Sequence, residues 1–276
     1  MPISNNDIVY YYDTHQINYD LFWSKTALHY GFWYEDTKNL AEAISNTDKF
    51  VIKVLAINSE DTVLDAGCGV GGTSIYVAKT TGARVEGVTL SDNQLKIISR
   101  RIAQLGGGTA RLLNFSKQDY TQTNFKENTF SKIYGIESIC HAHKKIDFLN
   151  EAYRIMKPGG KIAVVDAFLT KNNFDSEENK IYTKFTEGWL LPNLATKDEF
   201  SKYLAQAGFK NIVFHDMRSN VKKSSDRLYY LGLLASPLNF ILSKLGIMRE
   251  NFSPVYQKAL FERMATYGVF VAEKSE

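Results

Sequence analysis

From about residue 62 onward, short apolar runs alternate with stretches whose apolar residues recur at helical spacing. This alternation is typical of a parallel sheet with helices on both faces. The sequence therefore predicts an α/β, Rossmann-like fold with a seven-stranded, mostly parallel sheet. The expected strands are 62–65, 84–89, 110–115, 130–136, 160–166, 211–217 and 267–273, and the expected helices are 73–80, 92–105, 144–156 and 197–206.

Three segments lie outside this alternation. Residues 1–58 are rich in aromatic side chains and are expected to form a helical N-terminal lead-in, whereas 167–196 and 218–266 are expected to be helical lid inserts. Neither linker composition nor an internal repeat separates these segments from the rest. The sequence predicts one domain over 1–276, divided into a lead-in (1–58), a cofactor-binding core (59–166), substrate-side inserts and lid (167–266), and the last strand and tail (267–276).

The motif MKPGG, residues 156–160, is expected to mark a boundary inside the core. Pro158 cannot continue a helix, because it lacks a backbone N–H, and the glycines that follow it favour an open turn. We therefore expect the helix 144–156 to end here and a turn to lead into the next strand.

The charge and cysteine content argue against several classes of partner. Lys and Arg number 33 against 30 Asp and Glu, so the net charge is +3, and no basic block predicts binding to nucleic acid. Cys68 and Cys140 are far apart and fit neither a disulfide framework nor a metal site. The N-terminal residues lack the pattern of a secretory signal. These features predict a cytoplasmic protein with reduced thiols and no bound metal.

The most apolar segment, residues 228–242, is too short to cross a bilayer, which needs about 20 apolar residues. Pro237 and Asn239 also interrupt it. The sequence therefore predicts no transmembrane segment. The segment could instead cap a pocket or touch a membrane surface.

The glycine-rich turn LDAGCGVGG, residues 64–72, follows the first expected strand. Its glycines allow the backbone to approach a ligand, and the next helix offers free amide groups at its N-terminus. A dinucleotide, a nucleotide phosphate or S-adenosylmethionine could fit such a turn. Asp65 precedes the first glycine by two residues; its carboxylate would repel a pyrophosphate and could accept a hydrogen bond from the amine of an amino acid-like ligand. This favours S-adenosylmethionine.

The motifs VLDAGCGVGG, VEGVTLSDNQL, KQDY, IESICHAH and MKPGGKIAVVD, in this order and spacing, resemble the class I S-adenosylmethionine-dependent methyltransferases. Within them the chain is similar to the branch of the sterol and tocopherol C-methyltransferases and bacterial small-molecule methyltransferases, and more distantly to the cyclopropane synthases. The resemblance covers residues 60–166, and 267–274 resemble the family's last strand. It implies S-adenosylmethionine as cofactor and leaves the acceptor open.

The resemblance also implies a set of cofactor-binding residues. Those expected around the methionine part are Asp65, Gly67 and Gly69, with Tyr12 and either His29 or Tyr30 from the lead-in. Those expected around the ribose and adenine are Thr89, Leu90, Gln94, Gln118, Asp119 and Tyr120. Thr89 stands where many members carry an acid, which also argues against a nicotinamide enzyme. For the lead-in residues the alternative is that aromatic side chains at helical spacing only fill the core.

Glu137 and His141, in IESICHAH, are four residues apart, so a helical turn after the fourth strand would place them on one face. At the carboxyl edge of the sheet that face would point into the ligand crevice. The resemblance implies His141 as a general base and Glu137 as its partner or as the holder of a cation. The alternatives are a structural histidine and a glutamate that binds the cofactor. Asp166, which ends the fifth expected strand, could contact substrate or cap the following loop.

The predicted function is methyl transfer by in-line displacement from a sulfonium, a reaction that gains from a closed, water-free pocket. Aromatic residues make up 13% of the chain, and the inserts are apolar. We therefore expect a small apolar acceptor, such as an isoprenoid, a sterol-like molecule or another natural product. The alternatives are N- or O-methylation of an amine, a phenol or a sugar-bearing metabolite, a nicotinamide-dependent oxidoreductase, and a cofactor-binding protein without catalysis.

Overall fold

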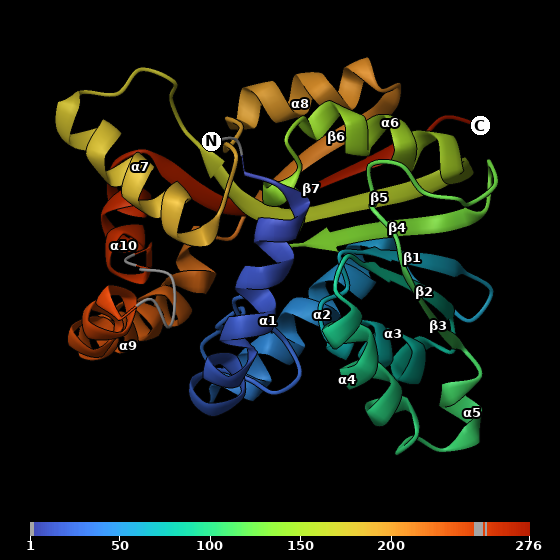
Figure 1. Cartoon of the computed structure of the whole chain (residues 1–276). Coiled ribbons are helices and arrows are strands. Elements are labelled where there is room, and N and C mark those ends of the chain that lie inside the picture. The colour runs from blue at the N-terminus through green and yellow to red at the C-terminus, as the bar shows by residue number, and fades with distance from the viewer. Residues whose placement is uncertain (1–2, 246–250, 252) are drawn as a thin grey trace.

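The computed structural model describes residues 3–245, 251 and 253–276; residues 1–2 of the predicted lead-in and 246–250 and 252 of the second insert lie outside the described residues. Within the described chain, one seven-stranded sheet has the order β3-β2-β1-β4-β5-β7-β6 (Figure 1). Strands β1, β2, β3, β4 and β5 are parallel to one another, whereas β7 is antiparallel to β5 and to β6. The strands are β1 (Thr62–Ala66), β2 (Arg84–Thr89), β3 (Leu113–Lys117), β4 (Phe130–Ile136), β5 (Met156–Leu169), β6 (Phe209–Asp216) and β7 (Ala265–Lys274).

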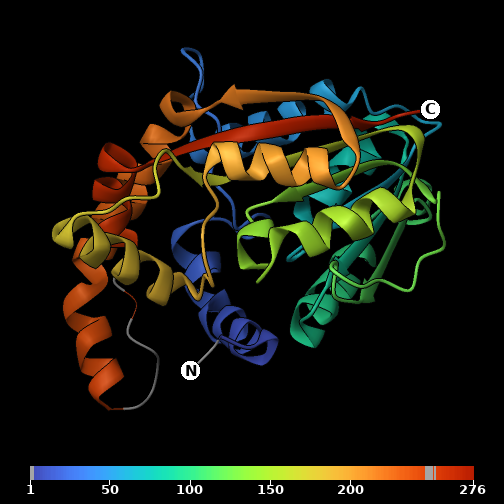
Figure 2. The same cartoon turned by 90° about the horizontal axis from the view of Figure 1, so that it is seen from above.

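Helices cover both faces of the sheet, which confirms the predicted fold class (Figures 1 and 2). The four helices expected at 73–80, 92–105, 144–156 and 197–206 are present, as are helices in the lead-in and in both inserts. The helices are α1 (Asn5–Phe22), α2 (Leu40–Leu55), α3 (Gly72–Thr81), α4 (Asp92–Ile102), α5 (Gly107–Ala110), α6 (Lys145–Ile155), α7 (Ser176–Trp189), α8 (Lys197–Gln206), α9 (Arg218–Lys244) and α10 (Ser253–Arg263), with one 3₁₀ turn, η1 (Ile139–His141).

Several helices begin at residues that cap them locally. The Asn39 side chain accepts a hydrogen bond from the Glu42 amide at the start of α2. Capping boxes start α7, through Asp175 and Glu178, and α8, through Thr196 and Glu199. A side chain that accepts from the first free amides of a helix stabilises it by about 1 kcal/mol. The inserts therefore contain the N-capping residues that define where α7 and α8 begin.

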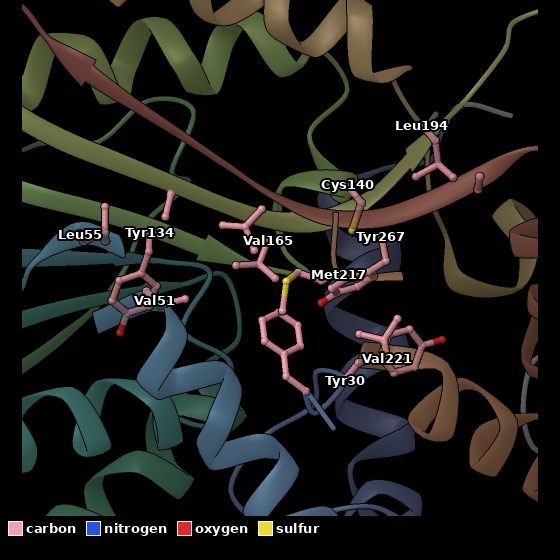
Figure 3. Close-up of a cluster of buried hydrophobic side chains, with 14 of the residues drawn as sticks. Tyr30, Val51, Leu55, Tyr134, Cys140, Val165, Leu194, Met217, Val221 and Tyr267 are labelled. Atoms are coloured by element: carbon pink, nitrogen blue, oxygen red, sulfur yellow. The ribbon is translucent and has the colours of Figure 1, made fainter. Parts of the chain in front are cut away.

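The core has two parts, one on each face of the sheet. Successive residues of β1 point to opposite faces, so Val63 packs with α2 and α3 while Leu64 packs with α6 and α8. Figure 3 shows the first part: Val51 and Leu55 of α2 lie near Tyr134 at one end, and Tyr30, Tyr267 and Val221 gather at the other end. The first part thus continues from the sheet to the lead-in and α9.

Several boundaries differ from the prediction, and two of these differences have a local cause. Strand β3 begins at Leu113 rather than at residue 110, because the short helix α5 occupies residues 107–110. The turn predicted at MKPGG is wrong: α6 ends at Ile155, and residues 156–160 already belong to β5. Met156 pairs with Phe130, and a shift of register before Lys132 accommodates the proline and the glycines within the strand.

The centre of the sheet, between β1 and β4, is where the chain reverses the direction in which it adds strands. In such sheets a crevice forms outside the carboxyl ends of the strands at this point. Helix α1 lies at these carboxyl ends, between α4 and the group formed by α7, α9 and α10 (Figures 1 and 2). Among the described residues, no helix is long and apolar enough to cross a membrane.

Replacing Gly72 by Ala is expected to destabilise the junction between the lead-in and the glycine-rich turn. A Cβ on Gly72 would lie 1.8 Å from the carbonyl oxygen of Thr26, so the lead-in has to move. Overpacking of this kind costs about 1–3 kcal/mol, which lowers Tm by about 2–4 °C per kcal/mol in a chain of this size. Circular dichroism measures the melt, and limited proteolysis reports on the lead-in.

The matched control is Gly107→Ala, because a Cβ on Gly107 has no neighbour within 4 Å. This variant should melt and resist protease like the unaltered protein. Equal melting and equal protease resistance of the two variants would contradict the close approach of Thr26 to Gly72.

Candidate functional site

A cavity of about 420 Å³ opens at the carboxyl edge of β1, β2 and β4. The lead-in, the glycine-rich turn, the segment after β4 and both inserts contribute to its lining. Every residue that the sequence analysis assigned to cofactor binding or catalysis lies in this lining. These residues are Tyr12, His29, Tyr30, Asp65, Gly67, Gly69, Thr89, Leu90, Gln94, Gln118, Asp119, Tyr120, Glu137 and His141.

The glycine-rich turn has a backbone that other residues would strain. Gly67 and Gly69 have φ values of +87° and +52°, in the left-handed region. A Cβ on Gly67 would lie 2.4 Å from the Cβ of Ser138, in the segment after β4. The amides of Gly67 and Cys68 donate to the carbonyl of Val88, 3.1 and 2.9 Å away. The turn is therefore tied to the end of β2 and leaves its backbone open toward the cavity.

Asp65 places a buried carboxyl group beside this turn. Its side chain accepts hydrogen bonds from the Ser74 hydroxyl at 2.6 Å and from the Tyr134 hydroxyl at 3.0 Å. Burial raises the pKa of Asp65 to about 6, and these two hydrogen bonds limit the rise. At neutral pH the group carries negative charge in the cavity wall, where it can balance a ligand cation such as an ammonium.

The wall formed by the ends of β2 and β3 is polar. The Thr89 hydroxyl donates to the Gln94 side chain at 2.5 Å, and Asp119 accepts from Asn5 at 2.9 Å. The Tyr120 hydroxyl donates to the carbonyl of Ser138 at 2.7 Å, which ties this wall to the segment after β4. Asp119 lines the cavity and can accept a hydrogen bond from a ligand. The hydroxyl of Thr89 already donates its one proton to Gln94, so toward a ligand it can only accept.

A buried polar network joins the lead-in to α3. The Thr73 hydroxyl donates to the Asp48 carboxyl group at 2.8 Å, and His29 Nε2 lies 3.3 Å from the same hydroxyl and 3.7 Å from Asp48. Burial raises the pKa of Asp48 to about 7 and lowers that of His29 to about 4. Sequence analysis did not single out Asp48, although an acidic residue on the apolar side of an amphipathic helix was a visible signal.

His141 is held in one tautomer by its neighbours. Nδ1 lies 3.3 Å from the carbonyl of Leu190, which can only accept, so Nδ1 carries the proton. Nε2 therefore accepts from the Tyr12 hydroxyl, 2.8 Å away. Burial lowers the pKa of His141 to about 4, so the ring is neutral at physiological pH. The unprotonated nitrogen faces the cavity side occupied by α1.

Glu137 sits in a different environment from the one expected. The helical turn after β4 begins only at Ile139, and Glu137 precedes it with a φ of +48°. Its side chain accepts from the Tyr30 amide and from the Tyr267 hydroxyl, both at 2.7 Å, whereas His141 is held by other groups. Burial raises the pKa of Glu137 to about 8, so this carboxyl group is largely protonated at neutral pH.

Lys145 and Asp166 fix the turn that carries His141. The Lys145 ammonium donates to the carbonyls of Cys140, Ala142 and Asn193 at 2.8, 2.6 and 3.0 Å. Asp166 lines the cavity and accepts from the Cys140 amide at 2.8 Å. It therefore caps the turn after β4 and not the loop after its own strand, which was one of its two expected roles. Sequence analysis missed Lys145, because a lysine in the first turn of a helix gives no sign of burial.

The inserts form an apolar end of the cavity. The side chains that line it there come from α7 and the following loop, from α9, from α10 and from the start of β7. They are Phe185, Trp189, Leu191, Leu194, Leu228, Phe261 and Tyr267. Among the described residues, no three His, Cys, Asp or Glu side chains are grouped so that they could hold a metal ion.

Comparisons with known proteins agree with this arrangement. Residues 3–228 match the family model described as mycolic acid cyclopropane synthetase. The sterol 24-C-methyltransferase of Saccharomyces cerevisiae is 31% identical over 212 residues, which are 76% of this chain and 54% of the yeast protein. The chain thus spans about half the length of this relative.

Solved structures match the whole fold. A cyclopropane synthase of Mycobacterium tuberculosis matches with a TM-score of 0.84 and 18% identity, over 99% of each chain. A geranyl diphosphate C-methyltransferase of Streptomyces coelicolor, solved with Mg²⁺, geranyl diphosphate and S-adenosyl-L-homocysteine, matches with a TM-score of 0.73 and 17% identity, over 98% of this chain and 97% of that one. At these identities the likeness concerns the fold.

Replacing Glu137 by Gln is expected to change how stability depends on pH. The folded protein holds the Glu137 proton up to a pKa of about 8, whereas an unfolded glutamate releases it near 4.5. Stability is therefore lost as pH rises across this window, by about 1.4 kcal/mol per unit at most. Gln keeps the oxygen that accepts from Tyr30 and Tyr267 and removes this loss. In urea unfolding, the free energy of unfolding of the variant relative to that of the unaltered protein should increase between pH about 5 and about 8.

Glu178→Gln provides the control, because its hydrogen bond with Lys171 lowers the pKa of Glu178. A lowered pKa adds to the free energy of unfolding, and this contribution reaches its full value once the pH is above the ordinary pKa of a glutamate. The free energy of unfolding of this variant should therefore differ from that of the unaltered protein by a constant amount in the same pH window. A constant difference for Glu137→Gln as well would show that its carboxyl group is ionised in the fold.

Proposed function

This chain belongs to the mycolic acid cyclopropane synthetase family, in the sterol C-methyltransferase-like branch of the class I S-adenosylmethionine-dependent methyltransferases, and we propose that it methylates a small apolar acceptor. The observation that carries the proposal is that one cavity has a polar end at the glycine-rich turn and an apolar end at the inserts. His141 contacts the carbonyl of Leu190, just after α7, and Tyr12 packs in the same small cluster as Trp189, so both lie beside the apolar end. A polar cofactor and an apolar acceptor would therefore share one cavity.

The polar end fits S-adenosylmethionine, the cofactor of this family. The turn has no Cβ at Gly67 or Gly69 to keep a ligand from its backbone. Asp65 offers a carboxylate for the amino group of the methionine part, and Asp119 offers an acceptor for the adenine amino group. When bound, the cofactor supplies an electrophilic methyl group on a positively charged sulfur.

The residues around the apolar end would exclude water and hold the acceptor in line with the methyl group. Orientation alone can contribute about 7–11 kcal/mol toward such a reaction. Aromatic rings such as those of Trp189 and Phe185 can also stabilise positive charge that develops on an acceptor carbon, by up to about 2 kcal/mol each. The proposal therefore assigns most of the rate enhancement to enclosure and orientation.

His141 is proposed as the group that takes up the proton released by the acceptor. Its Nε2 is unprotonated at neutral pH, because burial keeps the pKa of the ring near 4, and its electron pair accepts from the Tyr12 hydroxyl 2.8 Å away. When Nε2 takes up a proton, the Tyr12 hydroxyl turns its own proton away and its oxygen accepts from the new N–H. Glu137 is protonated in the same pH range and is proposed to hold Tyr30 and Tyr267 in place. This assignment separates the two residues that the sequence analysis paired as base and partner.

The proposed acceptor is a sterol-like or isoprenoid molecule. The apolar end is lined by aliphatic and aromatic side chains from both inserts. The names of a sterol C-methyltransferase and of a geranyl diphosphate C-methyltransferase among the similar proteins point the same way.

Cys68 and Cys140 are free, buried thiols. This fits a cytoplasmic location, which stays a prediction from the sequence.

Ligand binding and product formation test this proposal in turn. Isothermal titration calorimetry should detect S-adenosylhomocysteine and give no heat with NAD⁺, because Asp65 disfavours a pyrophosphate at the turn. A labelled methyl group from the cofactor should then appear in prenyl or sterol acceptors. Transfer only to amines, phenols or sugars would reject the apolar acceptor, and saturation by NAD⁺ alone would reject the whole proposal.

His141→Asn is expected to lower kcat by about 10²–10⁴-fold, the range for loss of a general base. Asn keeps a donor toward Leu190, and His141 is not expected to touch the adenosine part, so the Kd for S-adenosylhomocysteine should stay within a few-fold. The control is His143→Asn, because His143 is exposed and lies two residues away. Unchanged turnover in His141→Asn would remove His141 from the mechanism.

A further inference from the structure

The second half of α9 carries a group of large apolar side chains that remain exposed. Leu234 is 81% exposed, which is unusual for a leucine in a folded domain. The exposed residues of this group, which we call the α9 surface, are Tyr230, Leu233, Leu234, Phe240, Ile241 and Leu245. Contiguous apolar surface of this kind on a folded protein marks an interaction site.

The α9 surface forms one side of the helix. At about 100° per residue its members fall within about 140° of the circumference. The other side of α9 faces the protein: Ser224 is fully buried, and Gly232 lies close to Pro254 of α10. Figure 2 shows α9 projecting beyond the sheet at one end of the molecule. The exposed side is therefore free to meet a large, flat partner.

Basic residues flank the α9 surface on the same side of the helix. By the same helical spacing, Lys223 and Arg227 precede it and Lys244 follows Phe240 and Ile241. The acidic residue of this stretch, Asp226, is paired with Lys222 at 2.6 Å. An apolar row between cations is the pattern of a helix that lies in the interface of a bilayer with anionic lipids.

The end of α1 extends this surface. Leu21 and Phe22 are 68% and 55% exposed, and Arg227 donates a hydrogen bond to the Phe22 carbonyl at 3.4 Å. This hydrogen bond joins the end of α1 to α9, two segments that are 205 residues apart in the sequence. Lys25, just after α1, is also exposed.

The same two segments line the cavity. Trp23 follows Phe22 directly, and Leu228 follows Arg227, and both belong to the cavity lining. By the same helical spacing, Leu228 lies about 170° from the centre of the α9 surface, on the opposite side of α9. Exposed apolar side chains therefore adjoin the cavity lining at the end of α1, where the exposed Phe22 is followed by Trp23. An apolar molecule that leaves a bilayer beside Leu21 and Phe22 would meet Trp23 of the cavity lining next. Such a route limits its contact with water, which disfavours the transfer in proportion to the apolar area exposed.

We propose that the α9 surface, together with Leu21 and Phe22, docks on a bilayer that contains anionic lipids and receives the apolar acceptor from it. The delivery of the acceptor rests on the proposed function, whereas the docking does not. A second copy of this chain is disfavoured as the partner. A two-fold interface would bring this surface against its own copy and would place the flanking Lys223, Arg227 and Lys244 near basic residues of the other copy.

Co-sedimentation with vesicles tests the docking. The full chain should pellet with vesicles of phosphatidylcholine containing phosphatidylglycerol and bind those of phosphatidylcholine alone less well, with binding weakened by salt. The double variant Leu234→Glu, Ile241→Glu should lose at least ten-fold in binding, because both side chains would carry charge into the interface. Val213→Glu is the matched control, since Val213 is 49% exposed on β6, outside the α9 surface.

Three outcomes decide the proposal. Binding that is absent, or equal for the double variant and the control, would overturn it. A dimer in analytical ultracentrifugation that the double variant abolishes, without vesicle binding, would assign this surface to self-association instead. Each variant should bind S-adenosylhomocysteine normally, which excludes misfolding. Vesicle binding that persists while no acceptor is methylated would leave the docking standing and reject the proposed function alone.

Discussion

The close approach of the glycine-rich turn to the segment after β4 is the constraint on which the site depends. Gly67 has no room for a Cβ against Ser138, and its amide is bound to the end of β2. The Ser138 hydroxyl in turn donates to the carbonyl of Ala66 at 2.5 Å. The ends of β1, β2 and β4 are thereby locked to one another. Asp65 on one side and the His141 turn on the other then have fixed positions across the cavity.

Burial then determines the protonation of the groups that face this cavity. The same exclusion of water leaves His141 neutral and Glu137 protonated, whereas it raises the pKa of Asp65 only to about 6, so that Asp65 is ionised at neutral pH. The result is a negative charge on Asp65 at the turn, whereas His141 and Glu137 across the cavity are uncharged. A cavity with this distribution attracts a cationic ligand to the turn and accepts an uncharged molecule beside it.

The sequence was sufficient to predict local features and insufficient for those that depend on how elements meet. The alternation of apolar runs identified the strands, and the glycines with Asp65 identified the turn, because these signals are contained in a few neighbouring residues. Tyr267 reaches Glu137 only because β7 is antiparallel, which brings its first residues to the carboxyl edge. Lys145 and Asp48 likewise have partners that are distant in the sequence. The local spacing of apolar residues does not show in which direction a strand runs or where a helix packs.

Helix α1 connects the two ends of the cavity through contacts of unequal strength. Asn5 and Asp13 bond to Asp119 and Ser91 on the polar wall, and Tyr12 bonds to His141 on the other. Its apolar anchorage is a small separate cluster of Ile8, Tyr11 and Leu190 rather than the main core. The Asn5 bond is exposed and the other two are part-buried, and single bonds of this kind add little stability. We therefore expect α1 to open at a lower free energy than the sheet beneath it. A site closed by such a helix can admit ligands while the residues that orient them keep their positions.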